Sequence, residues 1–555
     1  MLFKGVNRRY QHIRRYRQIL EAFLRHGFGY LVQQLDLFYL LPWRRRLFKV
    51  EGRQPSLGKG LRQVFEELGP TFVKLGQMLS TRADLLSPDV IVELGRLQDE
   101  VEGIPFREVR NQIETELDCS LADAFDSIEE IPIAAASIGQ VHRAVLDGRE
   151  VVVKVMRPGI ENTVKTDLEI LYGLARIARD RYQTDLFDPV ELVEDFARRM
   201  RRELDYTVEA RNAARFRENL KRQQGIHIPE IYWSHTTPRL LTMELIEGTK
   251  VNQIQELRAK GIDPQDIARC GARSFMEQVM IHGFFHGDPH PGNILIEDDG
   301  TIAFIDFGLV GRLDQATMDS LAVLFVGIIK QDTSGIVKGL RDIAVFGEKA
   351  DLLELEHDID DVLFRYYGKA LGDLNVSEII SDILHLTRKH SIRLPADFAL
   401  LAKALLLIEG IGQELDDTFN ILEIAEPFAR ELLRKHYRPD EVIKKIVLGS
   451  KDYSEKILQL PLKLDTALDL VNRDKLQINF HHQGLEKLIV RLDIASNRLA
   501  FALIVAALVI GSSLMVQSNK GPAFLGLPLI GVAGFIIAAF FGIWLIISIV
   551  RSGRL

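Results

Sequence analysis

Two long apolar stretches near the C-terminus limit the folds open to this chain of 555 residues. Residues 499–516 and 525–550 contain no charged side chain over eighteen and twenty-six residues. A helix needs about 20 apolar residues to cross the hydrocarbon core of a bilayer, where only helices and closed barrels satisfy their backbone hydrogen bonds. Both stretches are too long and too apolar for a hairpin buried in a globular core. We therefore predict two transmembrane helices within residues 496–555, joined by a tight polar turn at residues 517–522.

The charges that flank this hairpin predict its orientation. Arg491 and Arg498 precede it and Arg551 and Arg554 follow it, whereas the turn between the two stretches carries only Lys520. Basic residues are enriched on the cytoplasmic side of membrane helices. We therefore expect both flanks of the hairpin, and the large segment that precedes it, to lie in the cytoplasm.

The N-terminal segment, residues 1–54, is strongly basic in a chain whose net charge is −7. The first 60 residues hold thirteen Lys or Arg and three Asp or Glu, and apolar residues recur at helical spacing from Tyr10 to Leu24. A basic amphipathic helix of this kind either lies on a membrane surface or packs on the main domain. Because the chain also carries membrane segments, an anionic lipid surface is the expected partner and nucleic acid is not. Two isolated cysteines, Cys119 and Cys270, provide neither a disulfide framework nor zinc-ligand spacing.

A stretch in the middle of the chain carries the residues of a phosphoryl-transfer site. It runs His286-Gly287-Asp288-Pro289-His290-Pro291-Gly292-Asn293, and Asp306-Phe307-Gly308 follows. An Asp, an Asn five residues later and an Asp-Phe-Gly beyond a short apolar run are the layout of a protein-kinase-like active site. Asp288 would orient the attacking hydroxyl or water, and Asn293 and Asp306 would hold Mg²⁺ with hard oxygen ligands. Asp306 by itself would indicate only a solvated turn, so the conjunction carries the prediction. His286 is interpreted as a structural histidine that bonds to the backbone.

The apolar runs 294–296 and 302–305 are separated by Glu-Asp-Asp-Gly-Thr. This pattern predicts a β-hairpin. Such a hairpin would bring Asn293 and Asp306 together at one end.

Upstream segments supply candidates for binding the phosphates of ATP. Residues 131–146 predict a strand, a tight loop and a second strand, at the place where a kinase carries its glycine-rich loop. Alanines replace the first glycines here, and since alanine rarely adopts positive φ we expect a stiffer loop. The predicted nucleotide-binding residues of this loop are Ala134, Ala135, Ala136, Ser137, Ile138 and Gly139. Lys154 ends a β-branched run and would pair with the α- and β-phosphates.

Further residues complete the predicted site. A helix carboxylate is needed to hold Lys154, and Glu203 is the candidate within one or two long helices over residues 160–222, although a solvated charged face explains it equally well. Residues 240–248 resemble a kinase hinge, in which the backbone at Glu244 and Leu245 would meet the adenine edge. An apolar stripe predicts a helix after Pro70, with Lys74 and Gln77 on its opposite, solvated face.

Together these residues resemble the UbiB family, also called aarF-domain-containing kinases, an atypical branch of kinase-like proteins. Lys74-Leu75-Gly76-Gln77 fits the KxGQ motif of that family, residues 134–137 its Ala-rich loop, and Glu203-Leu204-Asp205 its ExD motif. The resemblance covers about residues 55–330 and implies an α+β, protein-kinase-like two-lobe fold with a helical N-terminal extension. It also implies that the KxGQ helix folds over the site, where Lys74 and Gln77 would contact the ExD carboxylates, so that Lys74, Gln77 and Asp205 regulate access and the helix blocks protein substrates.

The resemblance implies a function as well. The apolar hairpin is similar to that of bacterial members that support ubiquinone synthesis, at the inner membrane, with ATP and Mg²⁺ as cofactors. A membrane lipid or polyprenyl quinone precursor, or water, would accept the phosphoryl group, and quinone-synthesis enzymes are possible partners. Alternatives are a small-molecule kinase or a nucleotide-gated scaffold for membrane-bound enzymes. The oligomeric state is not predicted.

These features predict five segments. They are a basic N-terminal segment (1–54), a helical extension (55–125), a kinase-like N-lobe (126–250), a helical C-lobe (251–495) and the transmembrane hairpin (496–555). Within the C-lobe, residues 400–411 are apolar but contain Lys403 and Glu409, which indicates a buried helix and not a third membrane span.

Overall fold

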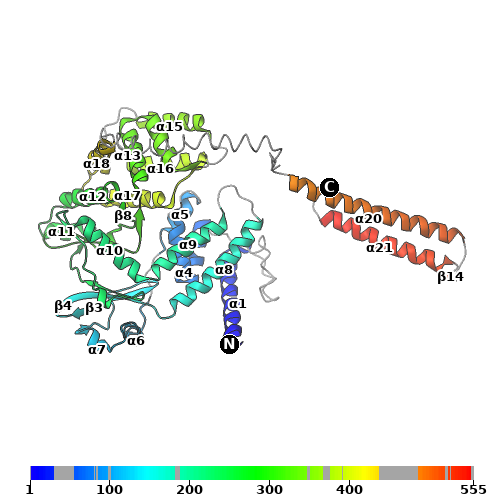
Figure 1. Ribbon diagram of the computed structural model, residues 1–555, viewed down its shortest axis with the longest axis horizontal. Helices are drawn as coiled ribbons and strands as arrows, with labels where there is room; N and C mark the ends of the chain where they lie inside the picture. Colours follow the sequence, from blue (N-terminus) through cyan, green and yellow to red (C-terminus); the bar gives the residue numbers. More distant parts are fainter. Residues whose placement is uncertain are drawn as a thin grey trace, which may run out of the picture. The chain divides into compact units, whose positions relative to one another are not determined.

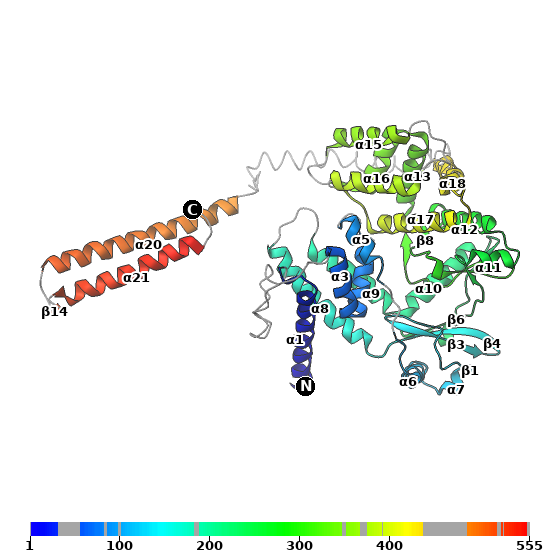
Figure 2. The same ribbon diagram turned by 180° about the vertical axis from the view of Figure 1, so that it is seen from behind.

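The computed structural model divides into two compact units, Met1–Lys445 and Ile446–Leu555 (Figures 1 and 2). The structure describes residues 2–30, 56–80, 82, 86–97, 102–181, 188–346, 351–366, 375–390, 392–436, 485–518, 523–524 and 527–551. The predicted polar turn at residues 517–522 and the second half of the basic segment 1–54 therefore lie largely outside the described residues.

An antiparallel sheet forms the first lobe of Met1–Lys445, and its strands are β1 (Ser127–Ile128), β2 (Ala134–Ala135), β3 (Gly139–Leu146), β4 (Arg149–Met156) and β6 (Leu240–Glu244). Asp147 and Gly148 join β3 to β4 with φ of 51° and 73°, which is the backbone of a type I′ hairpin turn. Val151, Val153 and Val155 alternate along β4 and are fully buried. They pack in one core cluster with residues of α6 (Phe106–Leu117) and α7 (Leu121–Ala124).

Three helices occupy the segment in which we predicted one or two, namely α8 (Ile160–Arg181), α9 (Pro189–Glu203) and α10 (Tyr206–Leu220). The break between α9 and α10 has a local cause. Asp205 is extended (φ −134°, ψ 94°) and its side chain accepts a hydrogen bond from the N–H of Thr207, which is the geometry of an N-cap. Glu203 and Glu209 therefore belong to different helices.

The N-terminal helices α1 (Leu2–Arg25), α3 (Leu57–Leu68), α4 (Pro70–Ser80) and α5 (Pro88–Leu94) pack against this arrangement. α4 begins at Pro70, as predicted. Arg15 of α1 donates to both carboxylate oxygens of Asp167 on α8, at 2.6 and 2.9 Å, and to the carbonyl oxygen of Leu68 at 2.7 Å. The second interpretation of the basic helix, packing on the main domain, thus holds for the face of α1 that carries Arg15.

Short strands and many helices build the second lobe. β5 (Ile226–His227), β10 (Ile302–Phe304), β9 (Ile294–Ile296) and β7 (Thr249–Lys250) form a sheet in that order, and β8 (Phe284–His286) pairs with β11 (Val310–Arg312). The predicted hairpin is confirmed, because Ile302 faces Ile296 and Phe304 faces Ile294. The remaining elements are η3 (Trp233–His235), α11 (Ile254–Ala259), α12 (Pro264–Met280), η4 (Pro291–Asn293), α13 (Gln315–Lys330), α14 (Thr333–Ile343), β12 (Val345–Phe346), α15 (Leu352–Tyr366), α16 (Val376–Lys389), β13 (Ile392–Arg393), α17 (Ala396–Leu415) and α18 (Ile421–His436).

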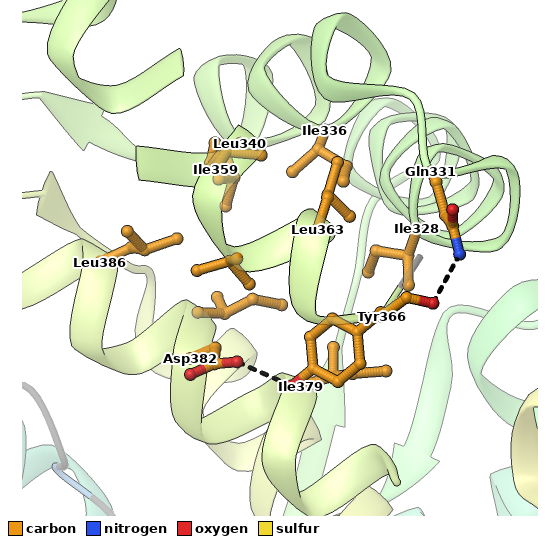
Figure 3. Close-up of a pocket in the computed structure, with 12 residues that line it drawn as sticks. Ile328, Gln331, Ile336, Leu340, Ile359, Leu363, Tyr366, Ile379, Asp382 and Leu386 are labelled. Atoms are coloured by element: carbon orange, nitrogen blue, oxygen red, sulfur yellow. Dashed lines mark hydrogen bonds between the residues drawn. The ribbon is translucent and has the colours of Figure 1, made fainter. Parts of the chain in front are cut away.

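The helices α13 to α16 lie at the end of this unit opposite the first sheet (Figure 1) and enclose a small apolar cavity of about 40 Å³ (Figure 3). Two hydrogen bonds close its polar rim: Tyr366 Oη donates to Asp382 at 2.7 Å, and Gln331 Nε2 donates to the carbonyl oxygen of Tyr366 at 3.0 Å. This volume is far below the roughly 150 Å³ of a cavity that binds benzene, so we assign no ligand to it.

The second unit contains α20 (Leu485–Ser518), β14 (Ala523–Phe524), β15 (Leu527–Pro528) and α21 (Leu529–Arg551). A Cβ on Gly534 would lie 2.1 Å from Ser512 Oγ, so the glycine lets the two helices approach closely, as small residues do in membrane helix pairs. Among the described residues, one helical stretch, Ser496–Gln517 with 22 residues, is long and apolar enough to cross a membrane. The apolar part of α21, Val532–Leu545, is shorter. The second transmembrane helix stays a prediction.

Candidate functional site

Lys154 of β4 is held by a carboxylate of α10, and that carboxylate is Glu209. Nζ of Lys154 lies 3.0 and 2.8 Å from the two carboxylate oxygens of Glu209 and 3.8 Å from Asp306 Oδ2. Burial opposes the charge on Lys154, but Glu209 and Asp306 outweigh it and raise the pKa of the lysine. The expectation that Glu203 pairs with Lys154 is wrong. The helix break at Asp205 puts the two glutamates on different helices, and it is Glu209 on α10 that pairs with Lys154.

Glu203 instead faces the KxGQ helix. Its carboxylate lies 3.3 Å from Nζ of Lys74 on α4. The Lys74 side chain is only 20% exposed, so the fully solvated face predicted from periodicity is wrong for this residue. Gln77 does not reach the ExD carboxylates, because its Nε2 donates to the carbonyl oxygen of Leu97 at 3.3 Å. Asp205 caps α10 through the N–H of Thr207 and so sets the direction of the helix that carries Glu209.

The Ala-rich loop turns sharply between β2 and β3. The N–H of Ala136 donates to the carbonyl oxygen of Gly139 at 2.8 Å, and Arg157 Nε donates to the carbonyl oxygen of Ala136 at 2.9 Å. None of residues 134–138 has a positive φ, so alanine is accommodated without strain. Whether the loop residues bind nucleotide stays a prediction.

A tyrosine that sequence reasoning overlooked lies under this loop. Tyr206, the first residue of α10, is 3% exposed, and Lys154 Nζ lies 5.2 Å from its ring centre. A Cβ on Gly139 would come within 2.2 Å of Tyr206 Oη. Among the described residues this hydroxyl has no hydrogen-bond partner. A buried polar group of this kind normally has one, which makes this hydroxyl a candidate contact for a bound polar group.

His286 connects the predicted catalytic loop to the turn that carries Asp306. Its Nδ1 accepts from the N–H of Asp288 at 3.1 Å, and its Nε2 lies 2.5 Å from the carbonyl oxygen of Asp306. Burial lowers the pKa of His286, which favours a neutral ring with one acceptor and one donor nitrogen. The interpretation of His286 as a structural histidine that bonds to the backbone agrees with these contacts.

The hairpin brings the predicted metal ligands to one end, where the N–H of Ile305 donates to the carbonyl oxygen of Asn293 at 3.1 Å. Asp306 Oδ1 accepts from the N–H of Gly308 at 2.9 Å. Burial alone would raise the pKa of Asp306, but Lys154 and this N–H lower it, so the carboxylate is ionised. Asn293 Nδ2 donates to the carbonyl oxygen of Asp288 at 3.2 Å, which leaves the amide oxygen for a cation.

Within the part of the chain that the structure describes, no group of three or more His, Cys, Asp or Glu could hold a metal by itself. Mg²⁺ commonly takes one or two protein ligands and completes its shell with water and phosphate oxygens. Asn293 and Asp306 therefore fit Mg²⁺ that arrives with a nucleotide, and the Asp306 side chain is 41% exposed and accessible.

The predicted hinge is partly occupied by contacts within the protein. Glu244 accepts from the N–H of Glu230 at 3.0 Å and lies 3.3 Å from Nε2 of His227. The N–H of Leu245 donates to the carbonyl oxygen of Glu150 at 3.2 Å, so this donor belongs to the sheet. An adenine contact at Glu244 or Leu245 would have to use other backbone atoms and stays a prediction.

Asp288 has a partner far away in the sequence. Its Oδ1 lies 2.8 Å from Nζ of Lys403 on α17. Lys403 had been noted only as a charge in an apolar helix. That combination, a lysine within a buried apolar helix, is the one sequence signal that could have marked it.

Comparisons with known proteins agree with this geometry. The ABC1 atypical kinase-like domain matches residues 96–340, the UbiB helical domain residues 359–420, and the ABC1/UbiB kinase-like C-terminal domain residues 483–551. A probable protein kinase UbiB of Xylella fastidiosa is 33% identical over 481 residues, which cover 85% of this chain and 87% of that protein. The chain belongs to the ABC1/UbiB family of atypical kinase-like proteins.

Other ABC1/UbiB relatives cover even more of the chain. An uncharacterized protein in the hydrogenase 1 5′ region of Clostridium pasteurianum is 31% identical over 542 residues, 98% of this chain and 99% of the relative. Protein ACTIVITY OF BC1 COMPLEX KINASE 8, chloroplastic, of Arabidopsis thaliana is 31% identical over 541 residues, 90% of this chain and 70% of the relative. The kinase-like fold of mixed helices and strands, expected from the motifs, is thereby confirmed for this ABC1/UbiB chain.

Proposed function

We propose that this chain is a membrane-anchored atypical kinase or ATPase that uses Mg–ATP and supports ubiquinone biosynthesis. The observation that carries the proposal is the convergence of Lys154, Glu209 and Asp306 next to the loop that holds Asp288 and Asn293. These are the side chains that phosphoryl transfer requires for phosphate binding, metal binding and orientation of the nucleophile.

Each residue has a distinct role in the proposal. Lys154, kept charged and in place by Glu209, contacts the α- and β-phosphates. Asp306 and Asn293 hold Mg²⁺, which when bound neutralises charge on the β- and γ-phosphates. Asp288 accepts the proton of the attacking hydroxyl or water.

The acceptor is proposed to be a lipid-like hydroxyl or water, not a protein side chain. Two observations support this. The helix α4 is fixed beside the site through the ion pair between Lys74 and Glu203, where it leaves less room for a polypeptide. The stretch Ser496–Gln517 has the length and apolarity of a membrane span, which would keep the chain at the surface where polyprenyl precursors reside. The name of the Xylella relative, probable protein kinase UbiB, supports kinase activity in this family but not the choice of a lipid-like acceptor.

The test uses the full chain reconstituted in vesicles with γ-labelled ATP. We expect Mg²⁺-dependent release of phosphate, or label in a lipid, that rises with anionic vesicles and is lost in Asp306→Asn. Asp298→Asn is the matched control, because Asp298 lies in the turn of the same hairpin, is 85% exposed and pairs with Lys260 outside the site. Equal turnover by the wild type and Asp306→Asn would overturn the enzymatic assignment.

A cellular experiment separates enzyme from scaffold. Cells that rely on this chain for quinone synthesis would carry the wild type, Asp288→Asn or Asp298→Asn, and their quinones and precursors would be measured by mass spectrometry. We expect Asp288→Asn alone to lower quinone content. Normal quinone content together with lost ATP turnover would instead favour the scaffold.

A further inference from the structure

α17 places Lys403 next to the loop that carries Asp288. Lys403 Nζ lies 2.8 Å from Asp288 Oδ1, and the two side chains are 33% and 32% exposed. The residues are 115 positions apart in the sequence. An ammonium that is half-buried beside the predicted catalytic carboxylate has a specific place in the site, unlike a lysine on a solvated face.

The position of Lys403 is fixed by packing on both sides. Leu400, one turn earlier on the same face of α17, touches the loop so closely that a Cβ on Gly287 would lie 2.8 Å from its side chain. Farther along the helix, Glu409 is 2% exposed and accepts from the N–H of Ile421 at 3.1 Å. Figure 1 shows α17 next to β8, the strand that leads into the loop. The helix that carries Lys403 is therefore held in place by contacts on both sides of the lysine.

The catalytic loop provides no such cation itself. The residues between Asp288 and Asn293 are Pro-His-Pro-Gly, and the ring of His290 is turned onto its own loop, where Nδ1 accepts from the N–H of Gly292 at 2.9 Å. Lys154 is engaged by Glu209 and Asp306. Among the ion pairs of the described residues, Lys403 is the one basic partner of Asp288. Without it, Mg²⁺ would neutralise charge on the phosphates, but no basic side chain of the described ion pairs would lie between Asp288 and a terminal phosphate.

We propose that Lys403 binds the γ-phosphate of the nucleotide and neutralises the charge between that phosphate and Asp288. The inference rests on the proposed function and adds a residue of the helical domain, residues 359–420, to the reacting centre. A lysine suits this role because its flexible stem carries a compact charge with three donors. It can keep one hydrogen bond to Asp288 and give another to a phosphate oxygen.

The chemical step balances with these groups. The oxygen of the acceptor hydroxyl or water forms a bond to the γ-phosphorus, and the bond from that phosphorus to the β–γ bridging oxygen breaks, so that ADP leaves. The acceptor proton passes to the Asp288 oxygen that Lys403 does not hold. Lys403 takes no part in the proton transfer and stabilises the charge on the phosphoryl group in transit, as fixed cations do in such transition states.

The test compares Lys403→Met with Lys389→Met in the full chain in detergent micelles. Lys389 is a matched control because it is also in the helical domain and also pairs with an aspartate, Asp358, at 2.6 Å. For Lys403→Met we expect kcat for ATP to fall by about 10²-fold, the typical loss when one preorganised donor is removed. Lys403→Arg, which retains the charge, should recover at least about a tenth of the wild-type kcat.

Nucleotide binding gives a readout that a purely structural role would not produce. We expect Lys403→Met to bind adenylyl imidodiphosphate about tenfold more weakly, roughly the effect of one charge-assisted hydrogen bond, and ADP with unchanged affinity. Equal weakening for both nucleotides, or wild-type values for both, would overturn the inference. If the methionine variant does not fold, the same comparison on Lys403→Gln decides.

These experiments distinguish a failure of the proposed function from a failure of the role assigned to Lys403. A wild type without Mg-dependent ATP turnover contradicts the proposed function, while the comparison of the two nucleotides still decides whether Lys403 contacts the γ-phosphate. A wild type that turns over ATP, with Lys403→Met no slower than Lys389→Met, contradicts only the role of Lys403.

Discussion

Replacing Glu209 by Gln tests which carboxylate holds Lys154, the lysine predicted to bind the phosphates. In the structure Lys154 donates to both oxygens of Glu209, at 2.8 and 3.0 Å, and Glu209 is 6% exposed. The substitution keeps the shape of the side chain but leaves the Lys154 ammonium, whose side chain is 20% exposed, with Asp306, at 3.8 Å, as its remaining anionic partner.

The expected loss of stability in Glu209→Gln follows from this geometry. Removing one partner of a buried ion pair costs about 3–5 kcal/mol. The amide oxygen of Gln can still accept one hydrogen bond, worth about 1 kcal/mol. We therefore expect Glu209→Gln to lower the free energy of unfolding by about 2–4 kcal/mol. A comparable loss in positioning Lys154 would lower kcat/KM for ATP by about 10²-fold.

Glu203→Gln is the matched comparison, because Glu203 was the predicted partner. Its pair with Lys74 is 3.3 Å long, with side chains 20% and 30% exposed. Such partly solvated pairs contribute up to about 1 kcal/mol. The loss of stability should therefore be clearly smaller than for Glu209→Gln.

The assay is urea unfolding of the full chain in micelles, combined with a double-mutant cycle that adds Lys154→Met. We expect a coupling energy of about 2 kcal/mol or more between Lys154 and Glu209, since residues in one buried ion pair are not additive. A coupling energy near zero, or a larger effect for Glu203→Gln than for Glu209→Gln, would refute the reasoning.

Three further predictions follow from single contacts. Gly139→Ala should lower stability by about 1–3 kcal/mol and weaken ATP binding, because the new methyl group would collide with the Tyr206 hydroxyl beneath the Ala-rich loop. Thermal melting and nucleotide titration check this prediction. An unchanged melting temperature and affinity would contradict the close contact. Arg15→Gln should lower the free energy of unfolding by about 3–5 kcal/mol, because it leaves Asp167, 0% exposed, as an unpaired buried charge. Adding Asp167→Asn should recover most of that loss in urea unfolding. No recovery would contradict the prediction. Burial opposes the charge on His227, but the hydrogen bond with Glu297 and a second nearby carboxylate raise its pKa. Its stabilising contribution should therefore be complete below about pH 6.5 and be lost as pH rises through the raised pKa. The stability advantage over His227→Gln should shrink as pH rises above about 6.5, and a constant difference would argue against it.

Much of the site could be predicted because its residues are close in the sequence. Asp288, Asn293 and Asp306 are joined by a short loop and a hairpin, and that hairpin, in which Ile302 lies opposite Ile296, was indicated by two apolar runs on either side of a turn sequence. The start of α4 at Pro70 was likewise a local property, since proline favours the first turn of a helix.

Contacts between distant segments could not be predicted in this way. The spacing of Glu203 and Glu209 does not reveal that α9 ends between them, because the break depends on a single capping side chain. The partner of Asp288 depends on how α17 packs against the loop, and periodicity gives no register between a helix and a loop more than a hundred residues away.

The sequence by itself determined which residue types could carry the proposed chemistry: carboxylates and an amide suited to Mg²⁺, a lysine suited to phosphates, and an apolar stretch long enough for a membrane. Residue type and local spacing are sufficient for that, because they fix which atoms can meet within one loop, hairpin or helix. Only the tertiary structure decided the charge partners, Glu209 for Lys154 and Lys403 for Asp288. A partner is selected by burial and distance in three dimensions, and among the many carboxylates and lysines of this chain only packing brings a particular pair within hydrogen-bonding range.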